Sequence, residues 1–121
     1  MELKGEAALL RIFLGEMDKV EHTPMYDEIV MRARKSGLSG ATVWRGIMGF
    51  GPTARMRTSK ILDLSSDLPI IVEIVDTREK LEPFLEMLHD LFESVQCGAL
   101  ITIEKVEVIR YLHGKGGDHN F

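Results

Sequence analysis

The chain has 121 residues, of which 45% are hydrophobic and 28% charged, and this composition is typical of one globular domain with its own core. The net charge of −4 argues against a nucleic-acid partner, because such partners are held largely by positive charge. A single cysteine, Cys97, excludes an internal disulfide, no apolar run approaches a membrane span, and the first residues lack a signal-peptide pattern, so we expect a cytoplasmic protein.

The first half of the chain predicts a strand and then a helix. Residues 8–16 alternate, with Leu10, Ile12 and Leu14 on one face, as in a half-buried strand. The pair Thr23-Pro24 predicts a helix start, with threonine as the N-cap and proline at the first helical position. Gly37 is expected to end this helix.

The stretch 40–51, GATVWRGIMGFG, is the part around which the rest is organised. Residues 41–50 alternate like a strand and end in Gly49-Phe50-Gly51. The next apolar run starts at Leu68, which leaves residues 52–67 as a long loop. Loops of this length are usually functional or disordered. We expect this loop to be mobile, loosest at residues 53–60, and open to trypsin at its cations Arg55, Arg57 and Lys60.

The second half predicts a strand, a helix and a final long strand. Residues 70–75 are apolar except for Glu73, as expected of a central strand. A helix follows Asp76-Thr77 and ends before Gly98. Residues 99–112 form a long β segment whose pattern shifts at Glu104-Lys105, which predicts a bulge or a second short strand. Residues 113–121 are expected to form a flexible tail.

The resulting order, β-α-β-β-α-β, predicts an α+β, ferredoxin-like split βαβ fold in residues 1–121. Two right-handed crossovers place the first and third of these strands at the centre of an antiparallel sheet, with both helices on one face. The second and fourth strands become long edges. Because exposed edges pair readily with other chains, the pattern alone predicts an oligomer.

Three segments resemble the PII signalling proteins, and more closely a small PII-like family known only as a domain of unknown function. They are GATVWRGIMGFG (40–51), LSSDLPIIVEIVD (64–76) and GALITIEKVEVIRY (98–111), within a similarity that runs from Leu9 to about Tyr111. The resemblance implies a homotrimer that binds adenine nucleotides in clefts between subunits. It also implies a non-enzymatic sensor that needs no cofactor and signals to a partner protein, with a membrane transporter as one candidate class.

The resemblance also implies which residues bind the nucleotide. Gly49, Phe50 and Gly51 correspond to the loop root whose backbone approaches the ligand. Thr42 corresponds to a strand threonine near the adenine, with one extra residue between it and Gly49. Glu73 and Arg110 correspond to a glutamate of the same cleft and to the first of two phosphate-binding arginines.

Two departures from the family pattern favour a smaller nucleotide, and a third argues against a known modification. Leu112 replaces the second arginine, and the glycine-rich, lysine-bearing loop before the last strand shrinks to residues 96–98. Residues 52–67 contain no tyrosine, which argues against uridylylation of the kind known for PII proteins. ADP or AMP is therefore favoured over ATP.

The residues themselves leave several alternatives open. Glu73, in an apolar strand, needs an arginine, a lysine or a hydroxyl beside it, and a structural ion pair is as consistent with the pattern as a ligand contact. Trp44 is interpreted as an interface or core residue. His113, Asp118 and His119 contain metal-binding groups, but a glycine-rich tail seldom fixes ligand geometry.

Two classes of function follow from the sequence. The first is a trimeric sensor that binds an adenine nucleotide and reports through residues 52–67. The second is a small ligand- or metal-handling trimer, or an enzyme, on the same fold, because fold alone does not determine function. We see no spacing of serine, histidine, aspartate or cysteine that indicates nucleophilic catalysis, and we name no catalytic or metal-binding residue.

Overall fold

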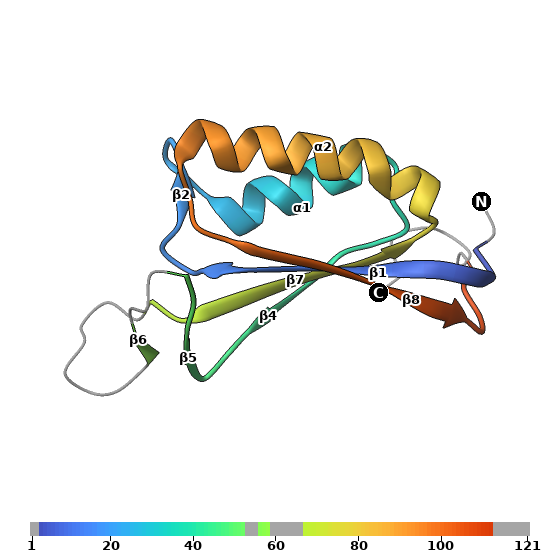
Figure 1. The fold of residues 1–121 in the computed structure, drawn as a ribbon, viewed down its shortest axis with the longest axis horizontal. Helices are drawn as coiled ribbons and strands as arrows, with labels where there is room; N and C mark the ends of the chain where they lie inside the picture. Colours follow the sequence, from blue (N-terminus) through green and yellow to red (C-terminus); the bar gives the residue numbers. More distant parts are fainter. Residues whose placement is uncertain (1–2, 53–55, 59–66, 113–121) are drawn as a thin grey trace.

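The computed structural model describes residues 3–52, 56–58 and 67–112. These residues form a four-stranded antiparallel sheet in the order β4-β7-β1-β8, with two helices on one face (Figure 1). The elements are β1 (Gly5–Gly15), β2 (Lys19–Val20), β3 (Thr23–Pro24), α1 (Met25–Lys35), β4 (Thr42–Arg45), β5 (Met48–Phe50), β6 (Met56–Thr58), β7 (Pro69–Asp76), α2 (Arg78–Val95) and β8 (Leu100–Val108).

The main sheet and its helices have the connectivity β1-α1-β4 and β7-α2-β8. This confirms the predicted α+β, ferredoxin-like split βαβ fold. The central strands are β1 and β7, and the edges are β4 and β8, as the apolar character of residues 70–75 predicts. The helices leave the opposite face of the sheet open (Figure 1).

The core lies between the sheet and the two helices. One alternate set of residues on each central strand points to the helices and is buried. The helices contribute residues at three- and four-residue spacing, as expected of an apolar stripe. Full burial of a large aliphatic side chain contributes about 1.5–3 kcal/mol. The core includes Leu10, Ile12, Leu14, Met25, Ile29, Ala33, Ile70, Val72, Ile74, Leu81, Phe84 and Leu88.

The first helix starts later than its sequence pattern predicts. Thr23 and Pro24 form β3, which pairs with Lys19–Val20, and Pro24 is the N-cap without a side-chain hydrogen bond. Helix α1 therefore begins at Met25, and the prediction of Thr23 as N-cap is wrong. The reason is that the short β2–β3 ribbon holds Thr23 in an extended conformation outside the helix.

The last strand shows no bulge. Each residue of β8 pairs with β1 in one continuous register, from Gly5 opposite Val108 to Phe13 opposite Leu100. The predicted bulge at Glu104-Lys105 is therefore wrong. Lys105 breaks the apolar pattern because it points toward the helices, where an apolar residue is expected. It is nevertheless exposed, because its long side chain reaches water at the edge of the core.

The segment predicted as one strand over residues 41–50 is divided into two. Strand β4 pairs with β7, whereas β5 leaves the sheet and pairs with β6 as a separate hairpin (Figure 1). Met56–Thr58 is therefore a short strand inside the segment 52–67, which the sequence predicts as one long loop. The other residues of the predicted mobile loop, except Pro52 and Asp67, lie outside the described residues.

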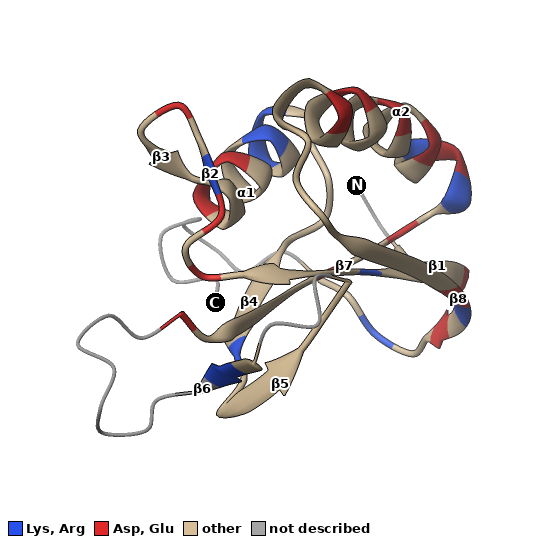
Figure 2. Cartoon of the chain, turned by 60° about the vertical axis from the view of Figure 1, so that its left-hand side comes forward, with Lys and Arg blue, Asp and Glu red and all other residues tan. Residues whose placement is uncertain are grey.

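Helix α2 begins with a capping threonine and exposes several acidic residues. Thr77 is its N-cap, and the Thr77 Oγ1 accepts a hydrogen bond from the Lys80 N–H at 3.3 Å, as predicted for a helix that opens at Asp76-Thr77. Acidic residues recur along this helix (Figure 2), and Glu82, Glu86, Asp90 and Glu93 among them are exposed. No described helix is long and apolar enough to cross a membrane.

Candidate functional site

The open face of the sheet carries a polar cluster around Glu73. The Arg11 Nε donates to Glu73 Oε2 at 2.8 Å, and the Trp44 Nε1 donates to Glu73 Oε1 at 2.8 Å. Arg11 also donates to Glu104 Oε1 at 2.5 Å. Both carboxylate oxygens of Glu73 are thus hydrogen bonded, and the expectation that Glu73 needs a cationic or hydroxyl partner is confirmed.

The electrostatics of this cluster keep Glu73 charged. The hydrogen bond from Arg11, and after it the bond from Trp44, lower the pKa of Glu73 below its ordinary value of 4.5. The hydrogen bond to Glu73 is likewise the main cause that raises the pKa of Arg11. At neutral pH the cluster is therefore a fixed ionic network.

Thr42 is the cross-strand partner of Glu73, so both expected nucleotide residues lie side by side on the open face. Trp44, two residues further along β4, is 55% exposed. It is therefore not a core residue of the described chain, and its indole covers the Glu73 side of the cluster. The interface alternative for Trp44 stays a prediction.

The glycine-rich root lies at one end of the sheet, against the start of β7. A Cβ at Gly46 would lie 3.3 Å from Pro69 Cβ, and a Cβ at Gly49 would lie 3.2 Å from Pro69 Cγ. The Gly46 N–H also donates to the Pro69 carbonyl at 2.7 Å. Glycine permits this close approach, and it allows β5 to leave the sheet across β7. Phe50, at the end of β5, is 70% exposed.

Arg110 lies near the opposite end of the sheet. The hydroxyl of its neighbour, Tyr111, donates to the Ser39 carbonyl at 2.6 Å, and the Ser39 N–H donates to the buried carboxylate of Asp76 at 2.8 Å. Ser39 precedes Thr42 by three residues, so this junction brings the segment of Arg110 to the start of β4. Arg110 itself is exposed.

One chain therefore places the expected nucleotide residues at two separate positions. Arg110 is tied through Tyr111 and Ser39 to Asp76 at one end of β7, whereas Gly49–Gly51 lie by Pro69 at the other end. These two ends are seven residues apart, or about 23 Å at the rise of a strand. Thr42 and Glu73 lie between the two groups, four residues from Pro69 along β7.

The sequence interpretation did not name Arg11 as the partner of Glu73, nor Asp67 as the partner of Arg57. Arg11 alternates with Leu10 and Ile12, and this alternation places it on the open face of a central strand, where Glu73 also lies. Arg57 is a cation of the predicted loop, and its side chain is only 14% exposed and donates to Asp67 Oδ2 at 2.5 Å. No sequence pattern reveals that pairing, because it depends on how the β5–β6 hairpin folds back.

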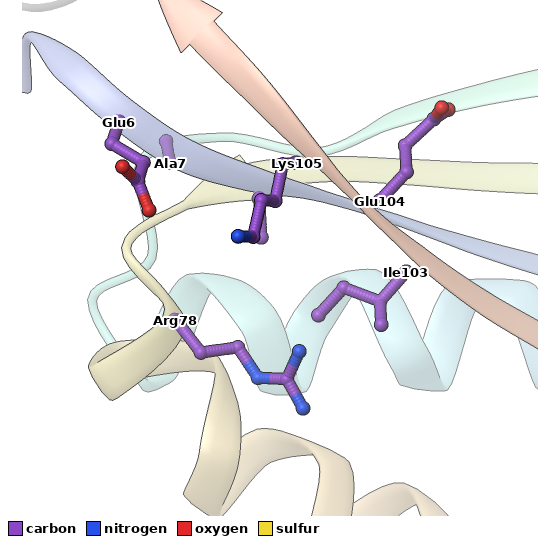
Figure 3. Close-up of a pocket in the computed structure, with 7 residues that line it drawn as sticks. Glu6, Ala7, Arg78, Ile103, Glu104 and Lys105 are labelled. Atoms are coloured by element: carbon purple, nitrogen blue, oxygen red, sulfur yellow. The ribbon is translucent and has the colours of Figure 1, made fainter.

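A cavity of about 390 Å³ lies between the start of α2 and the strands β1 and β8. Arg78 and Lys105 extend into it, whereas Glu104 points away toward the open face (Figure 3). The cavity contains none of the residues that the sequence selects for a nucleotide. We therefore place the candidate site at the two groups and not at this cavity.

Among the described residues, no three histidine, cysteine, aspartate or glutamate side chains gather as a metal-binding group. His113, Asp118 and His119 lie outside the described residues, so the alternative of a metal in the tail is not tested.

A comparison with protein-family models shows to which family the chain belongs. The model of the family DUF190, described as "Uncharacterized ACR, COG1993", matches residues 7–108. The chain belongs to the DUF190 family. It is 45% identical to a UPF0166 protein of Aquifex aeolicus over 84% of this chain and 91% of the relative. It is 36% identical to a UPF0166 protein of Methanocaldococcus jannaschii over 87% of this chain and 94% of the relative.

Solved structures of PII-like proteins have a fold similar to that of this DUF190 chain. CPII from Thiomonas intermedia, a nitrogen regulatory PII-like protein bound to ADP, AMP and bicarbonate, matches with a TM-score of 0.66 at 20% identity, over 87% of this chain and 90% of CPII. A PII-like signaling protein from Thermus thermophilus matches with a TM-score of 0.63 at 14% identity, over 88% of this chain and 93% of that one. The predicted resemblance to the PII-like family is confirmed.

Proposed function

We propose that this DUF190 protein is a non-enzymatic, PII-like regulator that binds an adenine nucleotide of the ADP, AMP or ATP class in a cleft between the subunits of a homotrimer. Thr42, Gly49, Phe50, Gly51 and Glu73 of one subunit, with Arg110 of a neighbouring subunit, form the binding set. The nucleotide acts as an effector, and no further cofactor is required. The protein works in the cytoplasm and reports to a partner protein through residues 52–67.

The observation that carries this proposal is the separation of two groups in one chain, Arg110 at the Asp76 end of β7 and Gly49–Gly51 at its Pro69 end. A ligand that bridges both groups joins two subunits, and a closed ring of three identical chains satisfies every such contact. The adenine nucleotides in the similar CPII support the ligand class. The bicarbonate in the same protein makes bicarbonate the second ligand to test.

Calorimetric titration with ADP, AMP and ATP tests the proposal. We expect saturable binding, with ADP or AMP bound at least as tightly as ATP because Leu112 stands where PII proteins place a second arginine. Nucleotide at a hundred times its dissociation constant raises the apparent free energy of unfolding by roughly 2.7 kcal/mol. Absence of both binding and thermal stabilisation with all three nucleotides contradicts the proposal.

The same samples separate a sensor from an enzyme. After prolonged incubation, chromatography of the nucleotide is expected to recover it unchanged. Conversion of ATP or ADP by the purified protein, lost in the Arg110→Ala variant, favours the alternative of an enzyme on this fold.

A further inference from the structure

Arg57 forms a buried ion pair at the root of the β5–β6 hairpin. The residue lies on β6 directly opposite Gly49. Its side chain turns inward, where the Nη1 donates to Asp67 Oδ2 at 2.5 Å, and the side chains of Arg57 and Asp67 are only 14% and 7% exposed. Asp67 lies two residues before β7. The pair therefore joins the outgoing hairpin to the returning chain, beside the glycine that the nucleotide is expected to approach.

Gly15 provides the space for this guanidinium. A Cβ at Gly15 would lie 1.9 Å from Arg57 Nη1 and 2.3 Å from Arg57 Cζ. The backbone of Gly15 is not in the left-handed region, so glycine is not needed there for its conformation. What the position requires is the missing side chain, which leaves a flat surface for the guanidinium at the end of β1.

The guanidinium is held by only part of its hydrogen-bonding capacity. A guanidinium has five N–H donors and binds a carboxylate or phosphate best with two parallel bonds. In the described chain Arg57 contacts one oxygen of Asp67, while the other oxygen, Oδ1, accepts from the Met17 N–H at 3.0 Å. Asp67 thus uses only one of its carboxylate oxygens on Arg57, whereas an oxyanion that turned two oxygens to the guanidinium would form one hydrogen bond more.

The ion pair between Arg57 and Asp67 is not required for a stable fold. The free energy that it costs to remove two charges from water offsets most of their mutual attraction. Apolar residues of similar size therefore often stabilise a protein as much as a buried ion pair does. A second carboxylate lies at Gly15, where Asp18 Oδ2 accepts from the Gly15 N–H at 2.7 Å. The hairpin root therefore holds a buried ion pair and a further carboxylate beside the candidate site.

We propose that Arg57 is an oxyanion-binding residue of the candidate site and that Asp67 occupies its guanidinium as an internal competitor while the site is empty. The inference rests on the proposed function. The oxyanion is either a phosphate of the nucleotide bound at Gly49–Gly51 or a free bicarbonate, since each presents two oxygens to a guanidinium as a carboxylate does. Binding of the oxyanion breaks the ion pair between Arg57 and Asp67. This detaches β6 from the start of β7, so that ligand binding changes the position of the β5–β6 hairpin.

Two substitutions and their combination test the exchange by calorimetry with ADP, bicarbonate and adenosine. Asp67→Asn keeps an acceptor for Met17 but removes the competing charge, and we expect the oxyanion ligand to bind about five-fold more tightly or better. Arg57→Gln should weaken the same ligand by about ten-fold or more. In the Arg57→Gln background, Asp67→Asn should have no further effect, and adenosine binding should not change in any variant.

The ligands identify the source of the oxyanion. A response of ADP alone assigns the site to the nucleotide's phosphate, and a response of bicarbonate alone assigns it to a free anion; both results support the exchange. If Asp67→Asn is folded by circular dichroism and binds ADP and bicarbonate no more tightly than wild type, the pair is a structural strut and the inference is wrong.

A separate measurement distinguishes this inference from the proposed function. The Nε–Hε resonance of Arg57 is followed by NMR while inorganic pyrophosphate is added to wild type and to Asp67→Asn. A saturable shift, at lower concentration in Asp67→Asn, supports the exchange even where no nucleotide binds and the proposed function fails. A resonance unmoved by pyrophosphate in both proteins overturns the inference even where nucleotide binds.

Discussion

Glu73 is held charged in the folded protein by Arg11 and Trp44, and this gives its contribution to stability a defined pH dependence. Because folding lowers the pKa of Glu73, the stabilising contribution is complete above the unfolded pKa, near 4.5, and is lost as the pH falls through the lower folded value. We predict that Glu73→Gln destabilises the protein at pH 7 and that the difference from wild type shrinks below pH 4.5.

Urea unfolding at a series of pH values measures this difference. Glu107→Gln, which removes an exposed glutamate from β8, controls for the loss of one negative charge from the sheet. A gap between wild type and Glu73→Gln that stays constant from pH 7 to well below 4.5 contradicts the role of Arg11 and Trp44 in lowering the pKa.

Arg110 is exposed, yet its segment is held by the hydrogen bond from Tyr111 to Ser39. An anchored backbone with an exposed cation is suited to an anionic ligand from a neighbouring subunit. A charge-assisted hydrogen bond contributes about 1.5–3 kcal/mol. We therefore predict that Arg110→Ala weakens ADP binding by about ten-fold or more without changing the mass of the assembly.

Calorimetry with ADP, together with sedimentation, tests this prediction. Lys4→Ala, which removes an exposed cation near the start of β1, is the matched control and should retain wild-type affinity. An Arg110→Ala protein that is folded and binds ADP with wild-type affinity shows that Arg110 is not a phosphate ligand.

The residues of the site were predictable to different degrees. A carboxylate within an apolar strand had to be paired, and this requirement follows from residue type alone. The alternation of β1 places Arg11 on the same face, but its pairing with Glu73 depends on the register of β1 against β7, which no local pattern states. The burial of Arg57 could not be predicted from local sequence, because it depends on the missing side chain of Gly15, 42 residues earlier in the chain.

At the scale of elements, the β5–β6 hairpin protects from trypsin a residue, Arg57, that the sequence predicts to be accessible. Arg57 lies in a paired strand and its guanidinium is held by Asp67, so trypsin cannot take this side chain into its specificity pocket. We predict that folded wild-type protein resists cleavage after Arg57. Gly15→Ala places a methyl group where the guanidinium lies, and it should make this bond cleavable without altering any charge.

Limited digestion followed by mass mapping measures the cut after Arg57 relative to cuts elsewhere. Gly40→Ala is the control, because a Cβ at Gly40 has no heavy atom within 4 Å and its backbone is not in the left-handed region. The prediction fails if wild type is cut rapidly after Arg57, or if Gly15→Ala and Gly40→Ala are cut at the same rate.

The elements themselves were largely readable, and the errors lie where tertiary contacts overrule a local pattern. The strand over residues 41–50 has an unbroken alternation, but Gly46 and Gly49 pass so close to Pro69 that the chain leaves the sheet between them. Thr23-Pro24 is a typical helix start by residue type, but both residues pair with β2 as strand β3. Neither contact is visible in a window of neighbouring residues.

At the scale of the whole molecule, the open face of the sheet lacks a covering layer within the described chain. Apolar side chains on this face are half-buried, and they surround the charged cluster of Arg11, Glu73 and Glu104. Exposed apolar surface of this kind marks an interface. The apolar residues are Leu9, Phe13, Ile71, Val75, Val106 and Val108.

We predict a homotrimer whose three nucleotide sites each combine Arg110 of one subunit with Gly49 of the next. Sedimentation equilibrium should give three times the mass of the 13.7 kDa chain at micromolar concentration. Mixing tests the shared site directly: Arg110→Ala and Gly49→Val should each abolish tight ADP binding. When the two are denatured and refolded together, roughly a quarter of the sites in random trimers regain both intact halves. A mixture that binds no ADP shows that one chain supplies both halves, and a mass of one or two chains contradicts the trimer.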